Sequence, residues 1–252
     1  MRTFAVYNLK GGVGKTATAV NLAFLSALGG ARTLVWDLDP QGAAGFYFRI
    51  EARLKGGGKR LVRGDSRLAE LIQHTGYENL DLLPADFSFR HLDLELDAAK
   101  NPQRRLARIL EEVDGDYDHA FLDCAPSVSL ASEAVLHAAE VLLVPLIPTP
   151  LSMRTLEQVE QFAGKHGPKD LQLLPFFCLV DRRRKLHNEI SEVREVRGSR
   201  FLRAAIPYAS VVEQMGTRMA PLGAYAPSSP AAEAYVGLWR EIVRRTRRAA
   251  TS

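Results

Sequence analysis

The sequence predicts an α/β fold, in which a doubly wound and mostly parallel β-sheet is flanked by helices. Apolar, strand-like runs alternate with helical patterns along the chain, as in folds with helices on both faces of a sheet. A glycine-rich turn joins the first of these runs to the first helix. The length of 252 residues suits one domain of this kind. We therefore expect a single domain over residues 1–252.

Composition and cysteine usage narrow the class of protein. Hydrophobic residues make up 46% of the chain and charged residues 25%, which is typical of a globular domain. No apolar stretch approaches the roughly 18 residues that a membrane span requires, and the chain enters a strand without a signal-peptide pattern. Cys124 and Cys178 lie in or beside apolar runs, so we expect reduced core residues and no disulfide. These features favour a cytoplasmic protein.

Apolar runs and helical periodicity define the expected elements in chain order. Strands are predicted at residues 4–8, 33–37, 80–84, 117–123, 141–147 and 173–180. Helices are predicted at residues 15–28, 67–74, 104–113, 129–138, 155–165 and 231–247. Residues 42–65 are rich in glycine and arginine, and their composition predicts a mobile surface loop.

Residues 10–16 read Lys-Gly-Gly-Val-Gly-Lys-Thr and lie between the first strand and the first helix. This pattern predicts a phosphate-binding loop, because the glycines let backbone N–H groups face phosphate oxygens and the helix N-terminus favours an anion. Lys15 is then expected to reach the β and γ phosphates, and the Thr16 hydroxyl to ligate Mg²⁺. The usual motif has glycine five residues before Gly14. This chain has Leu9 there, followed by Lys10.

The early lysine resembles the deviant Walker A loop of the ParA and MinD family of P-loop ATPases. The resemblance implies that Lys10 reaches across an ATP-dependent homodimer to the phosphates of the partner. Lys10 and Lys15, which both contact phosphates, are therefore the expected catalytic lysines. It also implies that one stretch of the chain binds the nucleotide, namely Lys10, Gly11, Gly12, Val13, Gly14, Lys15, Thr16 and Ala17.

Two predicted strands end in acids. The strand at 33–37 continues as Asp37-Leu38-Asp39-Pro40-Gln41, which resembles the DxDPQ segment of ParA proteins, and the strand at 117–123 ends in Asp123, as in a Walker B segment. Ligands of open α/β sheets bind at the carboxyl ends of strands. By resemblance, Asp39 positions or activates the attacking water and Asp37 supports the metal shell, while Asp123 holds Mg²⁺ through a water. The expected metal residues are Thr16, Asp37, Asp39 and Asp123.

The resemblance extends over nearly the whole chain, and departures from it are informative. Ala205-Ile206-Pro207 resembles the loop that lies against the base, which implies a contact from Pro207. The chain contains no Asn-Lys-x-Asp or Thr-Lys-x-Asp guanine-reading pattern, which favours ATP over GTP. Ala17 stands where relatives have a second threonine that contacts the α-phosphate. The missing hydrogen bond is worth about 0.5–1.5 kcal/mol, so we expect weaker nucleotide binding. Tyr208 replaces an arginine of many relatives.

Positive charge is concentrated in the last quarter of the chain. Residues 182–252 contain fourteen Arg or Lys and six Glu, a net charge of +8, whereas the other residues carry −4. Basic residues on one surface give salt-sensitive, sequence-independent DNA binding, and the resemblance implies nonspecific double-stranded DNA as a partner. The alternative is a solvated helix face paired with glutamates. The candidate DNA-binding residues are Arg182, Arg183, Arg184, Lys185, Arg194, Arg197, Arg200, Arg244 and Arg247.

The function that these features predict is a ParA-like positioning ATPase that is nucleoid-associated. Its cargo would be a chromosome, a plasmid or a protein assembly such as a carboxysome, and a ParB-like or other cargo adaptor would stimulate an otherwise slow hydrolysis. One alternative is a MinD-like membrane-associated spatial regulator. The final helix has an apolar face formed by Tyr235, Leu238, Trp239 and Ile242, but no bulky apolar residue follows it, which favours packing on the sheet. Another alternative is a metabolic P-loop ligase resembling dethiobiotin synthetase.

Overall fold

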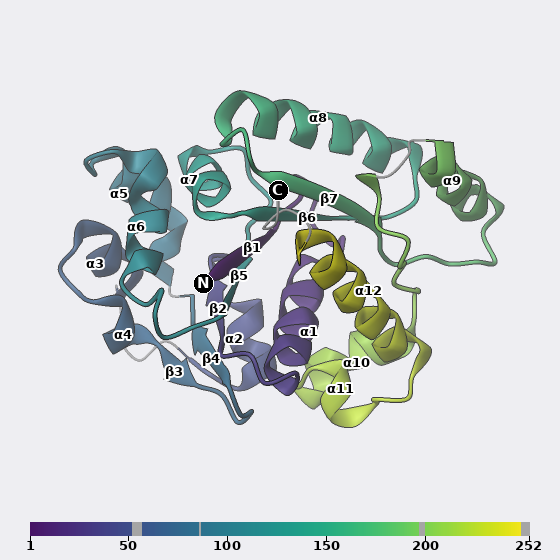
Figure 1. Cartoon of the computed structure of the whole chain (residues 1–252), viewed down its shortest axis with the longest axis horizontal. Coiled ribbons are helices and arrows are strands. Elements are labelled where there is room, and N and C mark those ends of the chain that lie inside the picture. Colours follow the sequence, from purple (N-terminus) through teal and green to yellow (C-terminus); the bar gives the residue numbers. More distant parts are fainter. Residues whose placement is uncertain (52–56, 86, 197–199, 248–252) are drawn as a thin grey trace.

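A seven-stranded sheet forms the centre of the molecule (Figure 1), with strand order β3-β4-β2-β5-β1-β6-β7. The computed structural model describes residues 1–51, 57–85, 87–196 and 200–247. Every strand pair is parallel except β3–β4, which confirms the predicted doubly wound, mostly parallel sheet. The strands are β1 (Arg2–Val6), β2 (Thr33–Asp37), β3 (Gln73–His74), β4 (Leu80–Leu83), β5 (His119–Asp123), β6 (Val141–Leu146) and β7 (Gln172–Phe177).

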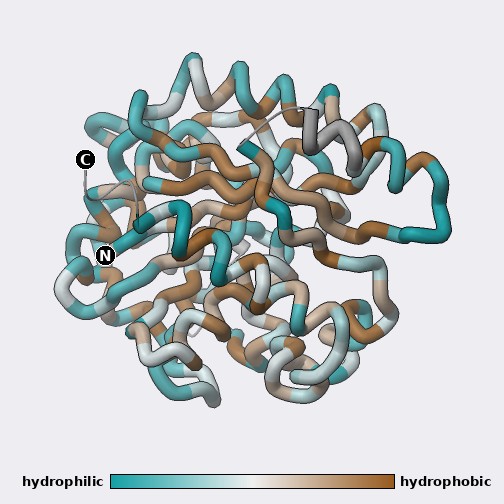
Figure 2. Tube along the Cα trace, turned by 45° about the vertical axis from the view of Figure 1, so that its right-hand side comes forward, coloured by the Kyte–Doolittle hydropathy of each residue, from teal (hydrophilic) through white to brown (hydrophobic). Residues whose placement is uncertain are grey.

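Alternate side chains of the central strands enter two hydrophobic cores, one on each face of the sheet. On β1, Phe4 and Val6 belong to one core and Ala5 to the other. Figure 2 shows hydrophobic strands through the middle of the molecule, whereas outer helices alternate between hydrophilic and hydrophobic residues. The Phe4 face packs against α1 (Lys15–Leu28), α2 (Ala43–Phe48), α10 (Ser210–Arg218), α11 (Leu222–Tyr225) and α12 (Pro230–Arg247).

The opposite face packs against a longer series of helices. These are α3 (Gly57–Arg63), α4 (Leu68–Leu71), η1 (Phe87–His91), α5 (Leu92–Asp97), α6 (Arg105–Glu111), α7 (Leu130–Ala138), α8 (Pro150–His166) and α9 (Lys185–Val196), with the short helix η2 (Pro102–Arg104) before α6. Among the described residues, no helix is long and apolar enough to cross a membrane.

The prediction of a mobile loop over residues 42–65 is wrong for the described part of that range, because α2 and α3 occupy it. Ala44 and Phe48 of α2 are buried in the core on the Phe4 face of the sheet, next to α1. Leu61 and Val62 of α3 are buried beside α5 on the opposite face. Residues 52–56 lie outside the described residues. Tertiary burial of these few apolar side chains outweighs the glycine-rich composition.

The helix predicted at residues 67–74 is also too long. Only Leu68–Leu71 is helical, and the next residues form β3, because Gln73 and His74 pair with Leu82 and Asp81 of β4. The helices α5, α9, α10 and α11 were not predicted from the sequence pattern.

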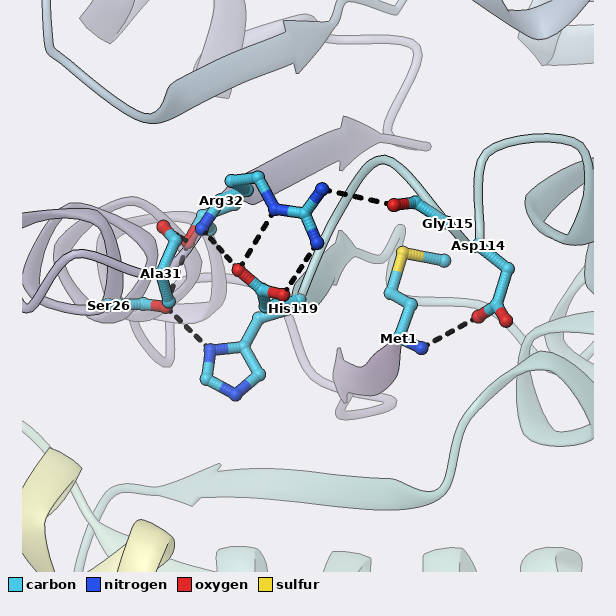
Figure 3. A network of polar contacts seen from close by, with 9 residues as sticks. Met1, Ser26, Ala31, Arg32, Asp114, Gly115 and His119 are labelled. Atoms are coloured by element: carbon cyan, nitrogen blue, oxygen red, sulfur yellow. Dashed lines mark hydrogen bonds and ion pairs between the residues drawn. The ribbon is translucent and has the colours of Figure 1, made fainter.

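At the amino ends of β2 and β5, a polar network ties the sheet to α1 (Figure 3). The Arg32 guanidinium donates to both Asp118 carboxylate oxygens, at 3.2 and 2.8 Å, and to the Gly115 carbonyl at 3.0 Å. The Ser26 hydroxyl lies 2.7 Å from His119 Nδ1. These contacts fix the end of the sheet that lies opposite the glycine-rich loop.

The last helix, α12, packs as its sequence pattern predicts. Tyr235, Leu238 and Ile242 are buried against the sheet. The Trp239 ring lies edge-on to Phe4 and His119, with centroids 5.6 and 5.5 Å apart. The apolar face of α12 is therefore part of the core.

Candidate nucleotide site

The glycine-rich loop after β1 has the backbone geometry of a phosphate loop. Gly12 and Gly14 have φ angles of +71° and +91°, a region that favours glycine. Gly14 caps α1 without any side-chain hydrogen bond, and no acidic residue lies in the first turn. The N–H groups and positive dipole end of α1 are therefore available to an anion. Gly11 and Gly12 are exposed, and Val13 is buried.

Asn8, which the sequence analysis did not single out, holds the start of this loop. The Lys10 N–H donates to Asn8 Oδ1 at 2.9 Å, and Asn8 Nδ2 donates to the Pro145 carbonyl of β6 at 2.8 Å. Lys15 is 7% exposed, and its Nζ donates to the Lys10 carbonyl at 3.2 Å. Burial lowers the pKa of Lys15, and the nearby Asp123 carboxylate opposes this shift. Two lysines thus lie on one fixed turn.

The strand-ending acids Asp37 and Asp123 lie side by side at the carboxyl ends of β2 and β5, where they are register partners. Both are fully buried, and neither Asp123 oxygen has a hydrogen bond of good geometry within the described residues. Burial raises the pKa of Asp123 well above its ordinary value and Asp37 adds to the shift, whereas Thr16 and Lys15 act in the opposite direction. A buried carboxylate without a partner is costly, so this pair favours a bound cation.

Asp37 also holds the start of α2. Its Oδ2 accepts from the Ala44 and Gly45 N–H groups at 3.0 and 3.2 Å, and its Oδ1 accepts from the Asp39 N–H at 3.2 Å. Burial raises the pKa of Asp37 to about 7 despite these hydrogen bonds. Asp39 is half-buried and accepts the Gln41 N–H at 3.0 Å. The two acids therefore link the sheet to the segment that leads into α2.

The donors present fit Mg²⁺ better than a closed metal cage. The described residues contain no group of three or more His, Cys, Asp and Glu that could hold a metal. Mg²⁺ usually takes one or two carboxylates together with substrate phosphates and waters. The unpartnered Asp123 carboxylate beside the Thr16 hydroxyl supplies such a partial shell. Bound there, the ion would neutralise phosphate charge.

The remaining predicted nucleotide residues border the same end of the sheet. Ala17 is half-buried in α1. Pro207 is half-buried and forms a parallel bridge with Val180, just beyond β7. Cys178 lies against the loop, since a Cβ on Gly14 would be 2.9 Å from its Sγ. The sequence gives no signal for this contact, because it joins segments more than 160 residues apart.

The basic residues predicted to bind DNA differ in their ion-pair partners. Arg183 pairs with both oxygens of Asp181, at 2.9 and 3.0 Å, at the carboxyl end of β7, and Arg184 lies 3.7 Å from the same carboxylate. Arg200 instead pairs with Glu160 of α8 at 3.3 Å. Three of the predicted arginines are therefore paired with acids of the same chain.

Charge pairing also differs among these residues. Lys185 lies 3.5 Å from Glu189. Arg197 and the side chain of Arg194 lie outside the described residues. Three candidates are exposed and form no ion pair within the described part of the chain, namely Arg182, Arg244 and Arg247. These three retain uncompensated charge for an anionic partner.

Comparisons with known proteins agree with this geometry. Residues 1–167 match a family model described as an AAA domain. The chain is 31% identical over 247 residues to the sporulation initiation inhibitor protein Soj of Bacillus subtilis, covering 96% of this chain and 98% of Soj. It is 29% identical over 256 residues to the chromosome partitioning protein ParA of Caulobacter vibrioides, covering 98% and 96% of the two chains.

Solved structures share the fold. Cobyrinic acid a,c-diamide synthase from Mycobacterium smegmatis with ADP and magnesium has a TM-score of 0.81 at 25% identity, covering 98% of this chain and 96% of that one. The Cyanothece McdA–ATP complex has a TM-score of 0.83 at 20% identity, covering 96% of each chain, which shows the fold alone.

Phosphate-loop geometry and a buried acid pair thus occur together with full-length similarity to Soj and ParA. The protein is an ATPase that uses ATP and Mg²⁺. The chain belongs to the Soj/ParA family of P-loop partition ATPases.

Proposed function

We propose that this ATPase is an ATP-switched positioning protein. ATP joins two copies into a sandwich dimer, in which Lys10 of each copy completes the phosphate site of the other. The closed dimer binds double-stranded DNA without sequence preference and is therefore nucleoid-associated in the cytoplasm. A ParB-like or other cargo adaptor then stimulates hydrolysis and release, so that a chromosome, plasmid or protein assembly is segregated or positioned.

The observation that carries the dimer is the state of Lys10. Its N–H is held by Asn8 and its carbonyl by Lys15, so the backbone is fixed. Its ammonium group has no hydrogen bond or ion pair within the described ranges, although it is next to the exposed Gly11 and Gly12. Lys15 already supplies a cation to the site of its own copy. A second fixed lysine with a free ammonium group suits the phosphates of another copy.

Two features support DNA as the anionic surface partner. The unpaired Arg182, Arg244 and Arg247 lie within the region of net charge +8. Arg244 and Arg247 are on the exposed side of α12, whose other side is buried. Exposed arginines suit phosphate contacts, which position a protein on DNA without reading bases.

Sedimentation with a non-hydrolysable ATP analogue tests the dimer. Wild type should be a dimer with the analogue and a monomer with ADP, whereas Lys10→Ala should bind the analogue and remain a monomer. Lys169→Ala, which removes an exposed lysine beyond α8, is the matched control and should dimerise. Dimerisation of Lys10→Ala with wild-type affinity would contradict the role of Lys10.

The likeness to a structure named as a diamide synthase supports a second candidate, a metabolic P-loop ligase. The two functions differ in what stimulates ATP turnover. A positioning ATPase hydrolyses ATP without a metabolite and responds to DNA, whereas a ligase requires an acid substrate and an amine donor. Turnover that DNA leaves unchanged, and that a carboxylic acid with glutamine increases, would favour the ligase.

A further inference from the structure

Three buried polar side chains meet behind the phosphate loop and have no role in the function described above. Cys178 directly follows β7, Thr18 lies on α1 and Tyr235 lies on α12. Each is at most 1% exposed. The Cys178 Sγ lies so close to Gly14 that an added Cβ would be only 2.9 Å away. The Cys178 N–H donates to the Leu146 carbonyl at 2.8 Å, which fixes this residue to β6.

The polar groups of this cluster are neighbours but are poorly bonded. The hydroxyl oxygens of Thr18 and Tyr235 have no hydrogen bond of good geometry within the described residues. Cys178 and Tyr235 belong to the same core cluster, and α1, which carries Thr18, packs against α12. Burial raises the pKa of Tyr235 well above its ordinary value, and Cys178 and Thr18 both contribute to its environment. A buried hydroxyl left without a partner destabilises the folded state. A conformation in which these hydroxyls are hydrogen-bonded is therefore favoured.

We propose that Cys178 and Tyr235 are positioning residues for the phosphate loop. The Cys178 thiol is the surface on which the Gly14 backbone rests, and the Tyr235 hydroxyl completes its hydrogen bonds to this thiol and to Thr18 when bound phosphates draw the loop closed. Nucleotide binding is thereby linked to the seating of α12 against α1. The linkage acts on ATP and ADP alike, because both place a β-phosphate in the loop.

A purely structural role for the cluster makes a different prediction. If the Tyr235 hydroxyl is only an unsatisfied group, its removal leaves nucleotide affinity unchanged and stabilises the protein. If it positions the loop, its removal weakens nucleotide binding, while the stability of the nucleotide-free protein stays the same or rises. A loss of nucleotide affinity without a loss of stability therefore occurs only in the positioning role.

Two measurements on wild type and Tyr235→Phe separate the positioning role from the structural role. One is titration with fluorescent ATP and ADP in the presence of Mg²⁺, and the other is thermal unfolding without nucleotide. We expect about threefold to tenfold weaker binding of both nucleotides, from the loss of one hydrogen bond, and no decrease in Tm. Tyr117→Phe is the matched control, because that hydroxyl donates to Asp81 at 2.7 Å away from the loop. It should lower Tm and leave affinity unchanged. Unchanged affinity in Tyr235→Phe, or affinity and Tm that fall together, would overturn the proposal.

Substitutions at Cys178 test the contact of its thiol with Gly14 and Tyr235. Cys178→Ser keeps a small hydrogen-bonding group, so nucleotide affinity should stay within about twofold of wild type, whereas Cys178→Val removes that group and should weaken binding at least as much as Tyr235→Phe. Equal nucleotide affinity of the two Cys178 variants would overturn the proposal. If Cys178→Val does not fold, the Tyr235→Phe comparison still decides the outcome.

Discussion

Ala17, in the first turn of α1 after Thr16, stands where the resemblance to the family predicts a second threonine. A threonine there would place a hydroxyl near the α-phosphate, and one such hydrogen bond contributes about 0.5–1.5 kcal/mol. Ala17→Thr should therefore tighten ATP binding about twofold to tenfold by titration. Ala17→Val has the same shape as the threonine variant without its hydroxyl, so it should show no gain. Equal affinity of the two variants would mean that position 17 makes no phosphate contact.

The Arg32–Asp118 pair at the other end of the sheet gives a prediction for pH. The Arg32 guanidinium holds the pKa of Asp118 at about 2, below its ordinary value. A lowered carboxyl pKa stabilises the folded state above the unfolded pKa of about 4, and this contribution is lost as the pH falls toward 2. The stability difference between wild type and Asp118→Asn, measured by denaturant unfolding, should therefore shrink over that range. A difference that stays constant with pH would contradict this account.

At the scale of elements, α2 depends on a single carboxylate. Asp37 accepts hydrogen bonds from the Ala44 and Gly45 N–H groups, so Asp37→Ala should leave these buried donors without a partner. We expect a loss of about 1–3 kcal/mol in the local stability of α2. Hydrogen exchange of residues 43–48 measures it, and exchange in β6 serves as the internal reference. Unchanged protection of residues 43–48 would show that packing alone holds α2.

The exposed arginines of α12 give a second prediction at this scale. Arg244→Ala with Arg247→Ala should weaken retention of nonspecific DNA and reduce its salt dependence, because each lost phosphate contact lowers the slope of affinity against salt by about one. Arg108→Ala with Arg154→Ala removes the same charge from exposed positions of α6 and α8 and is the matched control. Equal retention of both double variants would move the DNA surface away from α12.

The elements also show what the sequence predicts and what it does not. Buried strands such as β2 and β5 are continuous apolar runs, so their positions follow from composition, and parallel pairing brings their terminal acids Asp37 and Asp123 together. The helix α2 has six residues, and its start is held by a carboxylate from another element. No local pattern encodes such a contact. The cluster of Cys178 with Tyr235 escapes prediction for the same reason, because α12 returns to α1 only in the folded chain.

At the scale of the whole molecule, the two ends of the sheet differ in character. The carboxyl end carries the phosphate loop and the buried acids, whereas the amino end is fixed by the Arg32 network. The helix α12 packs along α1, with Tyr235 behind the loop and Trp239 against His119. One helix thus packs against α1 behind the nucleotide loop and against the opposite end of the sheet, and it also carries exposed arginines.

The central claim is that ATP switches this molecule between a free state and a DNA-bound state. The most direct test is to measure how strongly wild type and Lys10→Ala retain nonspecific duplex DNA. Each protein is measured in ADP, in ATP and in ATP at raised salt. The account predicts strong retention only for wild type in ATP at low salt, with loss in ADP, at raised salt and in Lys10→Ala. Equal retention in ADP and ATP, or wild-type retention by Lys10→Ala, would contradict an ATP-gated dimer as the DNA-binding form.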